Sequence, residues 1–408
     1  MDIRYNEQNR IANYKNIAFI FITIFILIVR KSDSLANPQL WAEDGVIFFA
    51  QQYEYGAAAI FTPYAGYLHI VPRIIAALAN AFFSYANIPT VYNYTSLFIT
   101  IIVVAHCFSP RLQLPLKPLL AFSMVLVPQA LNEVFLNITN LQWILCILLV
   151  LVLLKDAPNS KYGNYALQIC TDFCIILFAG LTGPFMIIMF PFFAWKYFNI
   201  KKIYGKILLM MAFCTASIQL FYIVSSTAFV QEGSMLNLDI FISVFGRKMF
   251  GGLFFGKSLI YSDAFFVCFS SLIFFTILLF LSYKKSPTDR YITKMVFMIL
   301  SISVGILGTV IMKCSLDTPI FIASRYFYVP YVLIAWSLIL CLNQDGIWKN
   351  IFVIVSLLLI PISTVSIGIQ TKMIDYNWKY YSSLIGTKTI VDIPINPHWS
   401  ITLHNKNK

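Results

Sequence analysis

Apolar runs alternate with short polar segments along the whole chain of 408 residues. Such runs are typical of helices that cross a membrane, although about 20 residues are needed to span ~30 Å of hydrocarbon. Several runs are shorter, so we expect their helices to extend into the flanking polar positions. The runs lie near residues 17–29, 88–108, 118–131, 141–154, 166–181, 185–198, 207–229, 259–282, 295–312, 327–342 and 350–369. The expected fold is an all-α polytopic membrane protein with about eleven transmembrane helices.

The first run, residues 17–29, is followed by Arg30 and Lys31 and has no Ala-x-Ala-like cleavage site. A signal peptide that is removed normally carries such a site. We therefore expect a retained first helix. No long polar segment interrupts the rest of the chain, which predicts one integrated membrane domain over residues 1–408.

The orientation depends on whether the apolar segment 68–85 crosses the bilayer. If it lies on the surface and the amino terminus is cytoplasmic, 16 Lys and Arg residues fall inside and 8 fall in the outer loops. The positive-inside rule favours this arrangement, with an interfacial helix within segment 68–85. The outer segments are then a first loop at 31–87, a second loop at 230–257 and a C-terminal segment at 370–408.

The composition of the chain narrows the range of possible functions. Hydrophobic residues make up 59% of the chain and charged residues 11%, which leaves no room for a separate soluble domain. The net charge of +12 comes from basic residues between apolar runs, where they orient a membrane protein, so we expect no nucleic-acid partner. The eight cysteines lack metal-ligand spacing and the histidines have no i, i+4 partner, so we expect no zinc site.

The first outer loop carries two adjacent carboxylates, Glu43 and Asp44. On a helix, neighbouring side chains point about 100° apart, so only one of the pair can face a common centre. Their simplest role is to lie at the amino end of a helix, where an acid contributes ~0.3–1 kcal/mol. Five other acids also fall in the outer loops, which makes the outer face the expected site of function. These acids are Glu54, Glu133, Glu232, Asp239 and Asp317.

A transferase on the outer face must take its group from a carrier that has already crossed the membrane, and a lipid carrier suits so apolar a chain. Six segments carry a family resemblance: Trp41-Ala-Glu-Asp-Gly45, Pro63-Tyr-Ala-Gly-Tyr-Leu-His69, Asn137-Ile-Thr-Asn-Leu-Gln-Trp143, Leu181-Thr-Gly-Pro-Phe185, Ser324-Arg-Tyr-Phe327 and Ile393-Pro-Ile-Asn-Pro-His-Trp399. With its acidic first loop and many short spans, the chain resembles the GT-C class of membrane glycosyltransferases. More narrowly, it resembles the serotype-converting O-antigen glucosyltransferases of enteric bacteria and their phages.

The resemblance implies transfer of a sugar, glucose by the narrower likeness, from undecaprenyl phosphate to a lipopolysaccharide O-antigen unit. The reaction is then expected at the periplasmic face of the bacterial inner membrane. The resemblance singles out Asp44 as the general base for the acceptor hydroxyl, with Glu43 second, and a single displacement would invert the anomeric carbon. A donor made in the cytoplasm also implies a donor synthase and a flippase as partners.

The charge of the leaving phosphate benefits from fixed cations. Arg325 and Arg73 are candidates, because a guanidinium matches the geometry of phosphate oxygens. Lys248 is a third candidate, in a glycine-rich stretch at 246–257 that could gate the donor entrance. The alternative for all three is ordinary anchoring, since basic side chains near span ends reach lipid headgroups.

Four residues of the expected outer loops carry groups that commonly bind sugars: His69, Tyr64, Asn140 and Trp143. Their alternatives are hydrogen-bonded packing for His69, helix capping for Asn140 and an interfacial anchor for Trp143. No cofactor is firmly predicted. The acidic pair could hold a divalent cation, because carboxylates are ligands for hard metals.

Two other functions stay open at this point. A transporter or flippase of lipid-linked sugars usually shows acids or broken helices near mid-membrane, and this chain does not show them clearly. An O-antigen polymerase tends to carry one large outer loop late in the chain, whereas the largest loop here comes first.

Overall fold

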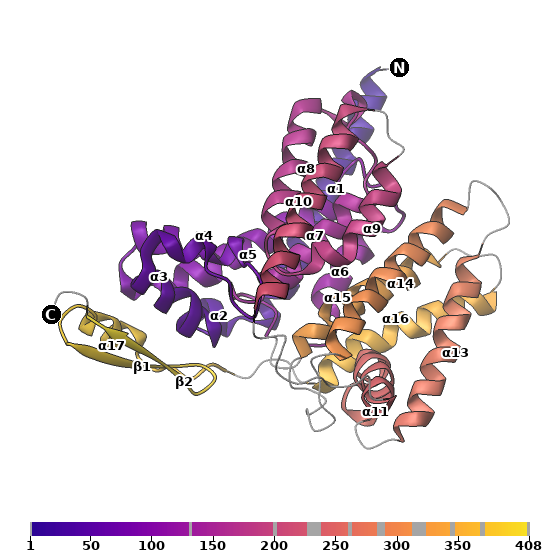
Figure 1. Cartoon of the computed structure of the whole chain (residues 1–408). Helices are drawn as coiled ribbons and strands as arrows, with labels where there is room; N and C mark the ends of the chain where they lie inside the picture. Colours follow the sequence, from indigo (N-terminus) through magenta and orange to yellow (C-terminus); the bar gives the residue numbers. More distant parts are fainter. Residues whose placement is uncertain are drawn as a thin grey trace.

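The computed structural model of the chain describes residues 2–129, 133–198, 202–226, 238–259, 263–283, 290–311, 324–342, 347–367 and 372–405. Within these ranges a helix lies at each of the predicted runs (Figure 1). The helices are α1 (Asp2–Arg30), α5 (Ile88–Cys107), α6 (Lys117–Leu126), α7 (Leu141–Leu154), α8 (Tyr165–Gly180), α9 (Phe185–Tyr197), α10 (Ile203–Ser225), α13 (Ala264–Ser282), α14 (Arg290–Ile311), α15 (Tyr328–Leu340) and α16 (Ile347–Ile367).

Five helices in the described part of the chain are long and apolar enough to cross a membrane: Tyr85–Cys107, α10, α13, α14 and α16. The expectation of a helical membrane protein is confirmed in this coarse form. The total of eleven spans stays a prediction, because helices such as α7, with 14 residues, extend only about 21 Å.

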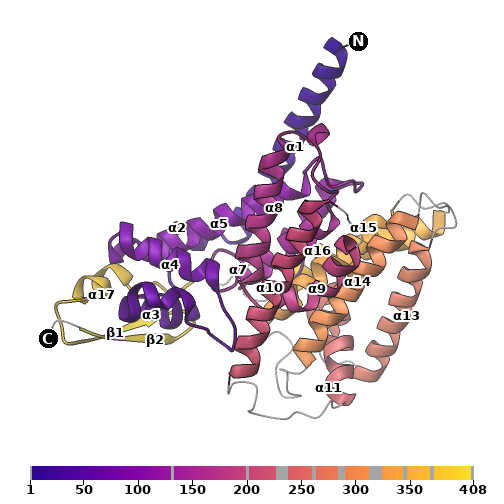
Figure 2. The same cartoon turned by 45° about the horizontal axis from the view of Figure 1, so that its top comes forward.

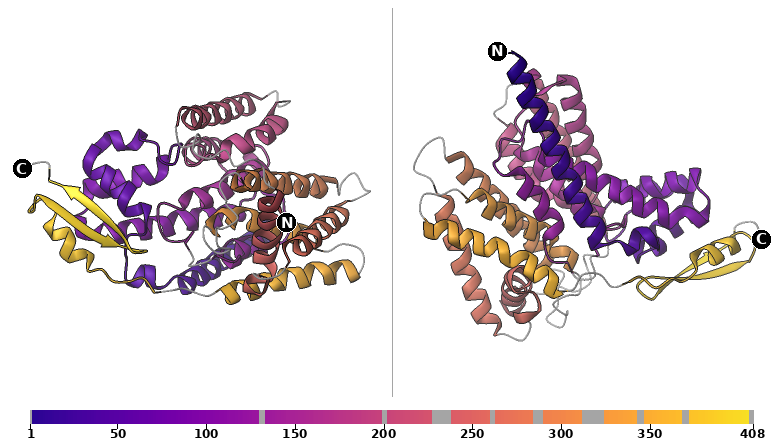
Figure 3. Two further views of the ribbon diagram at one scale, coloured as in Figure 1. Left: turned by 60° about the horizontal axis from the view of Figure 1, so that its bottom comes forward. Right: turned by 180° about the vertical axis from the view of Figure 1, so that it is seen from behind.

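Two short helices form the centre of the bundle. Every side chain of α7 and of α15 is buried, and α7 packs against α5, α8, α9 and α15. A helix that is apolar all round has no face for solvent, which explains its central place. The outer helices expose large apolar side chains such as Phe221, Phe266 and Leu358, as expected of surfaces that contact lipid. Helices α13, α14 and α16 form a second group beside α7–α10 (Figure 3).

Residues 31–87 fold into short helices that gather on one side of the bundle (Figure 1). The longest, α4, has 13 residues and extends about 20 Å, too short to cross ~30 Å of hydrocarbon. Its length suits a helix that lies along the interface. The elements of this loop are α2 (Asp33–Ala36), the π-helical turn η1 (Asp44–Phe49), α3 (Ala50–Tyr55), η2 (Gly56–Phe61), α4 (Ile70–Phe82) and η3 (Tyr85–Asn87).

The C-terminal segment contains α17 (Trp378–Leu384) and a β-hairpin that the all-α expectation did not include. Strand β1 (Ile390–Ile395) pairs antiparallel with β2 (Trp399–His404), and Ile393 lies opposite Ile401. Burial alternates along β1, which is the pattern of a strand with one covered face. The alternation was visible in the sequence, but only over six residues.

The hairpin packs on the first outer loop, where β2 contacts η1 and α3 (Figure 2). The backbone N–H of Ala42 donates to the carbonyl of Asn396 at 2.6 Å. The indole N–H of Trp378 donates to the carbonyl of Tyr85 at 2.8 Å. The first outer loop and the C-terminal segment therefore form one layer outside the bundle.

The described part of the predicted loop 230–257 is helical, and residues 230–237 lie outside the described residues. It comprises α11 (Leu238–Ile242), η7 (Ser243–Gly251), α12 (Gly252–Phe254) and the start of η8 (Gly256–Leu259). A Cβ at Gly246 would lie 2.8 Å from the backbone nitrogen of Cys268 in α13. This glycine therefore permits close helix packing. The remaining short elements are η5 (Ser160–Tyr162) and η9 (Ser324–Phe327).

Gly45→Val is expected to loosen the hairpin, because a Cβ at Gly45 would lie 2.5 Å from Cδ1 of Ile395 and 2.7 Å from Cδ1 of Ile401. Overpacking of this kind typically costs about 1–3 kcal/mol. Limited proteolysis should cut the C-terminal segment faster in this variant. Gly308→Val in α14 is the matched control, because a Cβ there meets nothing within 4 Å. Equal resistance of both variants would show that this contact does not hold the hairpin.

Candidate functional site

The Asp44 carboxylate is fully buried at the start of η1. Its Oδ1 accepts hydrogen bonds from the backbone N–H of Thr139 at 2.8 Å and from the Thr139 hydroxyl at 2.5 Å. Its Oδ2 accepts one from the backbone N–H of Ile138 at 3.4 Å. A carboxylate offers about four lone-pair positions, so these bonds leave room for one further donor.

Burial raises the pKa of Asp44 to about 7. The hydrogen bonds from Thr139 and Ile138 lower this pKa, and the neighbouring Glu43 carboxylate raises it. Lys31 is buried within electrostatic reach of Asp44; burial lowers the pKa of Lys31 to about 8, against the effect of the nearby carboxylates. Asp44 can therefore exchange a proton near neutral pH, as a general base must.

Glu43 lies against different groups. It is 7% exposed, and its Oε1 accepts a hydrogen bond from the Tyr64 hydroxyl at 3.3 Å. Burial raises the pKa of Tyr64 to about 12, and Glu43 adds to this effect. Glu43 directly precedes η1, and its side chain makes no hydrogen bond to the helix end, so it can act on the helix only through its charge. The two acids diverge, as adjacent helical positions require.

Glu133 and Arg325 form an ion pair, with Nη1 of Arg325 3.2 Å from Oε2 of Glu133. The backbone N–H of Arg325 also donates to Oε1 of Glu133 at 2.8 Å. The Arg325 side chain is 28% exposed and lies over the Tyr326 ring, within electrostatic reach of Glu43. Arg325 is therefore a fixed and partly exposed cation near Glu43.

Asn140 and Trp143 use their polar groups inside the protein. The Asn140 amide donates to the carbonyl of Glu133 at 2.7 Å, and its oxygen accepts from the Trp143 indole at 3.2 Å. Asn140 precedes α7 without capping it through its side chain. The Trp143 ring contacts Phe185 and Tyr326, with centroids 5.1 and 5.4 Å away. Both residues thus help to position residues 133–139, the segment that contains Glu133 and donates hydrogen bonds to Asp44.

His69 is 1% exposed and lies among aromatic rings. Its ring centroid is 4.7 Å from that of Tyr67 and 5.7 Å from those of Tyr64 and Phe48. The backbone of His69 pairs with that of Thr182, which joins the first loop to the turn between α8 and α9. His69 therefore packs against Tyr64, the residue whose hydroxyl donates to Glu43.

Arg73 is fully buried in α4 with few partners. Its Nη2 donates to Oε1 of Gln51 at 2.6 Å, and the guanidinium lies 5.1 Å from the centroid of the Phe48 ring. Its Nε and Nη1 have no hydrogen-bond partner among the described residues. Burial lowers the pKa of Arg73 to about 10, so it remains a cation at neutral pH. Burying a cation with so few hydrogen-bond partners costs free energy, and a bound anion would offset that cost.

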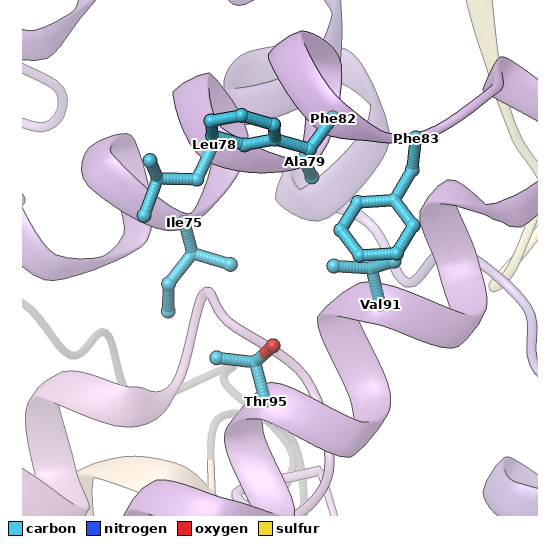
Figure 4. A pocket seen from close by; sticks show the side chains of 7 residues that line it. All are labelled: Ile75, Leu78, Ala79, Phe82, Phe83, Val91 and Thr95. Carbon is cyan, nitrogen blue, oxygen red and sulfur yellow. The ribbon is translucent and has the colours of Figure 1, made fainter.

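An apolar pocket of about 480 Å³ lies between α4 and α5 (Figure 4). Tyr92 on α5 is within electrostatic reach of both Arg73 and Asp44 but is not among the residues that line the pocket. Its only polar lining residue is Thr95, and the others are Ile75, Leu78, Ala79, Phe82, Phe83 and Val91.

Lys248 is buried in η7, which packs against α13 and α14, and its carbonyl accepts a hydrogen bond from the Tyr331 hydroxyl. These contacts place it with the second helix group, and none of them joins it to the acidic pair. Among the described residues, no three His, Cys, Asp or Glu side chains are grouped as metal ligands.

The six segments quoted from the sequence meet around this site. Six contacts join them: Ala42 with Asn396, Asp44 with Thr139, Glu43 with Tyr64, His69 with Thr182, Trp143 with Phe185, and Trp143 with Tyr326. Comparisons of the chain with protein-family models, curated proteins and solved structures find no match.

Sequence reasoning did not assign roles to Thr139, Lys31 or Tyr326, and it missed Glu133 as the partner of Arg325. Thr139 and Tyr326 lie inside two of the six resembling segments, so the sequence did indicate that they belong to the site. No sequence feature indicated the Glu133–Arg325 pairing, because 192 positions separate the two residues.

Glu133→Gln is expected to lower the free energy of unfolding by about 1–2 kcal/mol, because it removes the counter-charge of the partly exposed Arg325. The double variant Glu133→Gln, Arg325→Gln should be less unstable than the two single effects added together. Thermal unfolding in detergent measures both. Asp392→Asn, an exposed acid of β1, is the control. Additive effects would show that the ion pair contributes nothing to stability.

Proposed function

We propose that the chain is a glycosyltransferase of the bacterial inner membrane. It moves a sugar, glucose by the narrower resemblance, from undecaprenyl-phosphate-sugar to lipopolysaccharide O-antigen at the periplasmic face, with inversion. The amino terminus lies in the cytoplasm. A donor synthase and a flippase supply the donor, and membrane lipids surround the helices.

The observation that carries this proposal is the meeting of the six resembling segments, from Trp41 to Trp399, at one cluster of acids and cations. Segments so far apart in sequence would not be expected to share one site if their resemblance were accidental. The cluster contains two carboxylates, a partly exposed arginine and a second, buried arginine, and an apolar pocket lies between α4 and α5. A lipid phosphate donor needs this combination.

In the proposed reaction, Asp44 accepts the proton of the acceptor hydroxyl as its oxygen attacks the anomeric carbon. The bond from that carbon to the phosphate oxygen breaks, and undecaprenyl phosphate leaves with the electron pair. Arg325 and Arg73 stabilise the charge of the leaving phosphate. The isoprenoid chain occupies the apolar pocket between α4 and α5.

Asp44→Asn is expected to lower the turnover at least 100-fold, since a general base contributes roughly 10²–10⁴-fold. The measurement is transfer of labelled glucose from synthetic undecaprenyl-phosphate-glucose to O-antigen by the purified protein. Glu43→Gln, assayed in parallel, distinguishes the two acids, and gel filtration checks that both variants fold. The same assay with a chelator and with added Mg²⁺ tests whether transfer requires a divalent cation.

Near-normal turnover of Asp44→Asn would overturn its role as base. If the native protein binds the donor lipid but transfers no sugar, even with other donor sugars, a transporter or flippase becomes the better assignment. Joining of whole O-antigen units would instead indicate a polymerase.

The transfer rate is expected to rise with pH through about 7, because Asp44 acts only when ionised and its pKa is raised to about that value. The Thr139→Val variant loses a hydrogen bond that stabilises the ionised form, so its rising limb should move to higher pH. A profile that is flat from pH 5 to 8 would contradict the assignment. Thr171→Val, far from this site on α8, should leave the profile unchanged.

A further inference from the structure

The turn of the C-terminal hairpin lies beside the acidic pair, and the proposed transfer reaction uses none of its residues. The carbonyl of Asn396 accepts the hydrogen bond from the backbone N–H of Ala42. Ile395, the residue before Asn396, contacts the other side of the pair, where its Cδ1 would lie 2.5 Å from a Cβ at Gly45. The turn therefore touches the chain both before and after the acidic pair.

Trp399 follows this turn and lies opposite Ile395 in the strand pair. Residues directly opposite in an antiparallel pair share one face of the sheet, with Cβ atoms about 4.5–5.5 Å apart. Trp399 therefore lies on the face that covers η1, at the end of that face. Ile395 and Ile401 are 2% and 1% exposed, whereas Trp399 is 43% exposed. A large flat ring is thus accessible beside the acidic pair.

The segment before α17 holds the turn in place. The Asn396 side chain accepts a hydrogen bond from the backbone N–H of Ile374 at 3.0 Å and donates to the Ile374 carbonyl at 2.9 Å. The Tyr376 hydroxyl lies 2.9 Å from Nδ1 of His398, in an exposed hydrogen bond. Whichever of these two groups donates, a neutral His398 leaves the pair one further N–H or O–H donor. The turn therefore presents a ring and a hydrogen-bond donor in a fixed arrangement.

The chemistry of the turn suits an uncharged ligand. Residues 393–404 contain no Lys, Arg, Asp or Glu. A surface that binds anionic lipid headgroups or a phosphate usually offers basic side chains. A sugar ring instead has an apolar face that packs on an aromatic ring, and hydroxyls that donate and accept hydrogen bonds. The combination of Trp399 with the Tyr376–His398 pair therefore matches a neutral glycan.

We propose that the hairpin turn binds the acceptor glycan, with one sugar ring stacked on Trp399 and its hydroxyls bonded by the Tyr376–His398 pair. This inference rests on the proposed function, which makes O-antigen the acceptor, and it deepens that function by naming residues that bind the acceptor. These residues take no part in the chemical step. They determine the affinity for the glycan, whereas Asp44 determines the rate of transfer.

The first measurement is binding of lipid-free O-antigen polysaccharide to the purified full-length protein by calorimetry. Trp399→Ala should weaken the affinity roughly three- to tenfold, the usual effect of losing one aromatic contact. Trp399→Phe keeps a ring and should retain most of the affinity. Tyr380→Ala is the matched control, because this ring of α17 is 53% exposed in the same segment. Tyr376→Phe removes the hydrogen bond to His398 but keeps the ring, and it provides a second test if Trp399→Ala does not fold.

The second measurement separates binding from chemistry. In the transfer assay, Trp399→Ala should raise the KM for the polysaccharide by the same factor as it weakens the affinity. The kcat should stay unchanged, because the base and the cations are intact. A lower kcat with an unchanged KM would contradict a role in acceptor binding.

No binding of the polysaccharide to the native protein would overturn the inference, and so would unchanged affinity in both Trp399→Ala and Tyr376→Phe. The competing role of an exposed tryptophan is an interfacial anchor. In bilayers with brominated lipid chains, quenching of the emission that Trp399→Phe removes would place the ring in lipid and also overturn the inference. Binding that depends on Trp399 would support it even if no sugar is transferred, so this inference and the proposed function can fail independently.

Discussion

The architecture around the acidic pair depends on one buried carboxylate. Asp44 can lie inside the protein only because the Ile138–Thr139 segment supplies three donors to it. Those bonds join the first loop to the start of α7, the helix at the centre of the bundle. The loop in turn carries the hairpin, through Ala42 and Asn396. Without the carboxylate, the buried N–H groups at 138 and 139 would have no acceptor, and the layer outside the bundle would lose one of its attachments to the bundle.

The sequence predicted the helices well because long apolar runs leave a chain in lipid little choice of structure. It did not predict the hairpin, since the alternation in β1 covers only six residues and the turn contains no Gly. The site was foreseen in its acids and in Arg325, because isolated charges are conspicuous in an apolar chain. The pairing of Glu133 with Arg325 depends on how α7 and α15 pack, which no local pattern encodes. For the same reason, the sequence did not show that the polar groups of Asn140 and Trp143 bond inside the protein.

The charges of the two ends of α7 are organised differently. At its start, the two carboxylates have separate partners, and two guanidinium nitrogens of the buried Arg73 have no hydrogen-bond partner among the described residues. At its end, Arg111 forms an ion pair with Asp172, and Lys196 donates to backbone carbonyls at the end of α7. Buried ionic groups in a membrane protein are costly, and they persist where they are paired or have a ligand to bind.

The complete burial of α7 and α15 has a consequence for how the protein is made. Helices of 14 and 13 residues are too short to be stable alone in a bilayer, yet they follow directly on Thr139 and Arg325. The longer helices, such as α10 and α14, can insert by themselves and then provide a surface against which the short ones pack. The acidic cluster consequently comes together late in biogenesis, once the surrounding helices are in place. A newly inserted chain passes through a stage that is embedded in the membrane but has no assembled site.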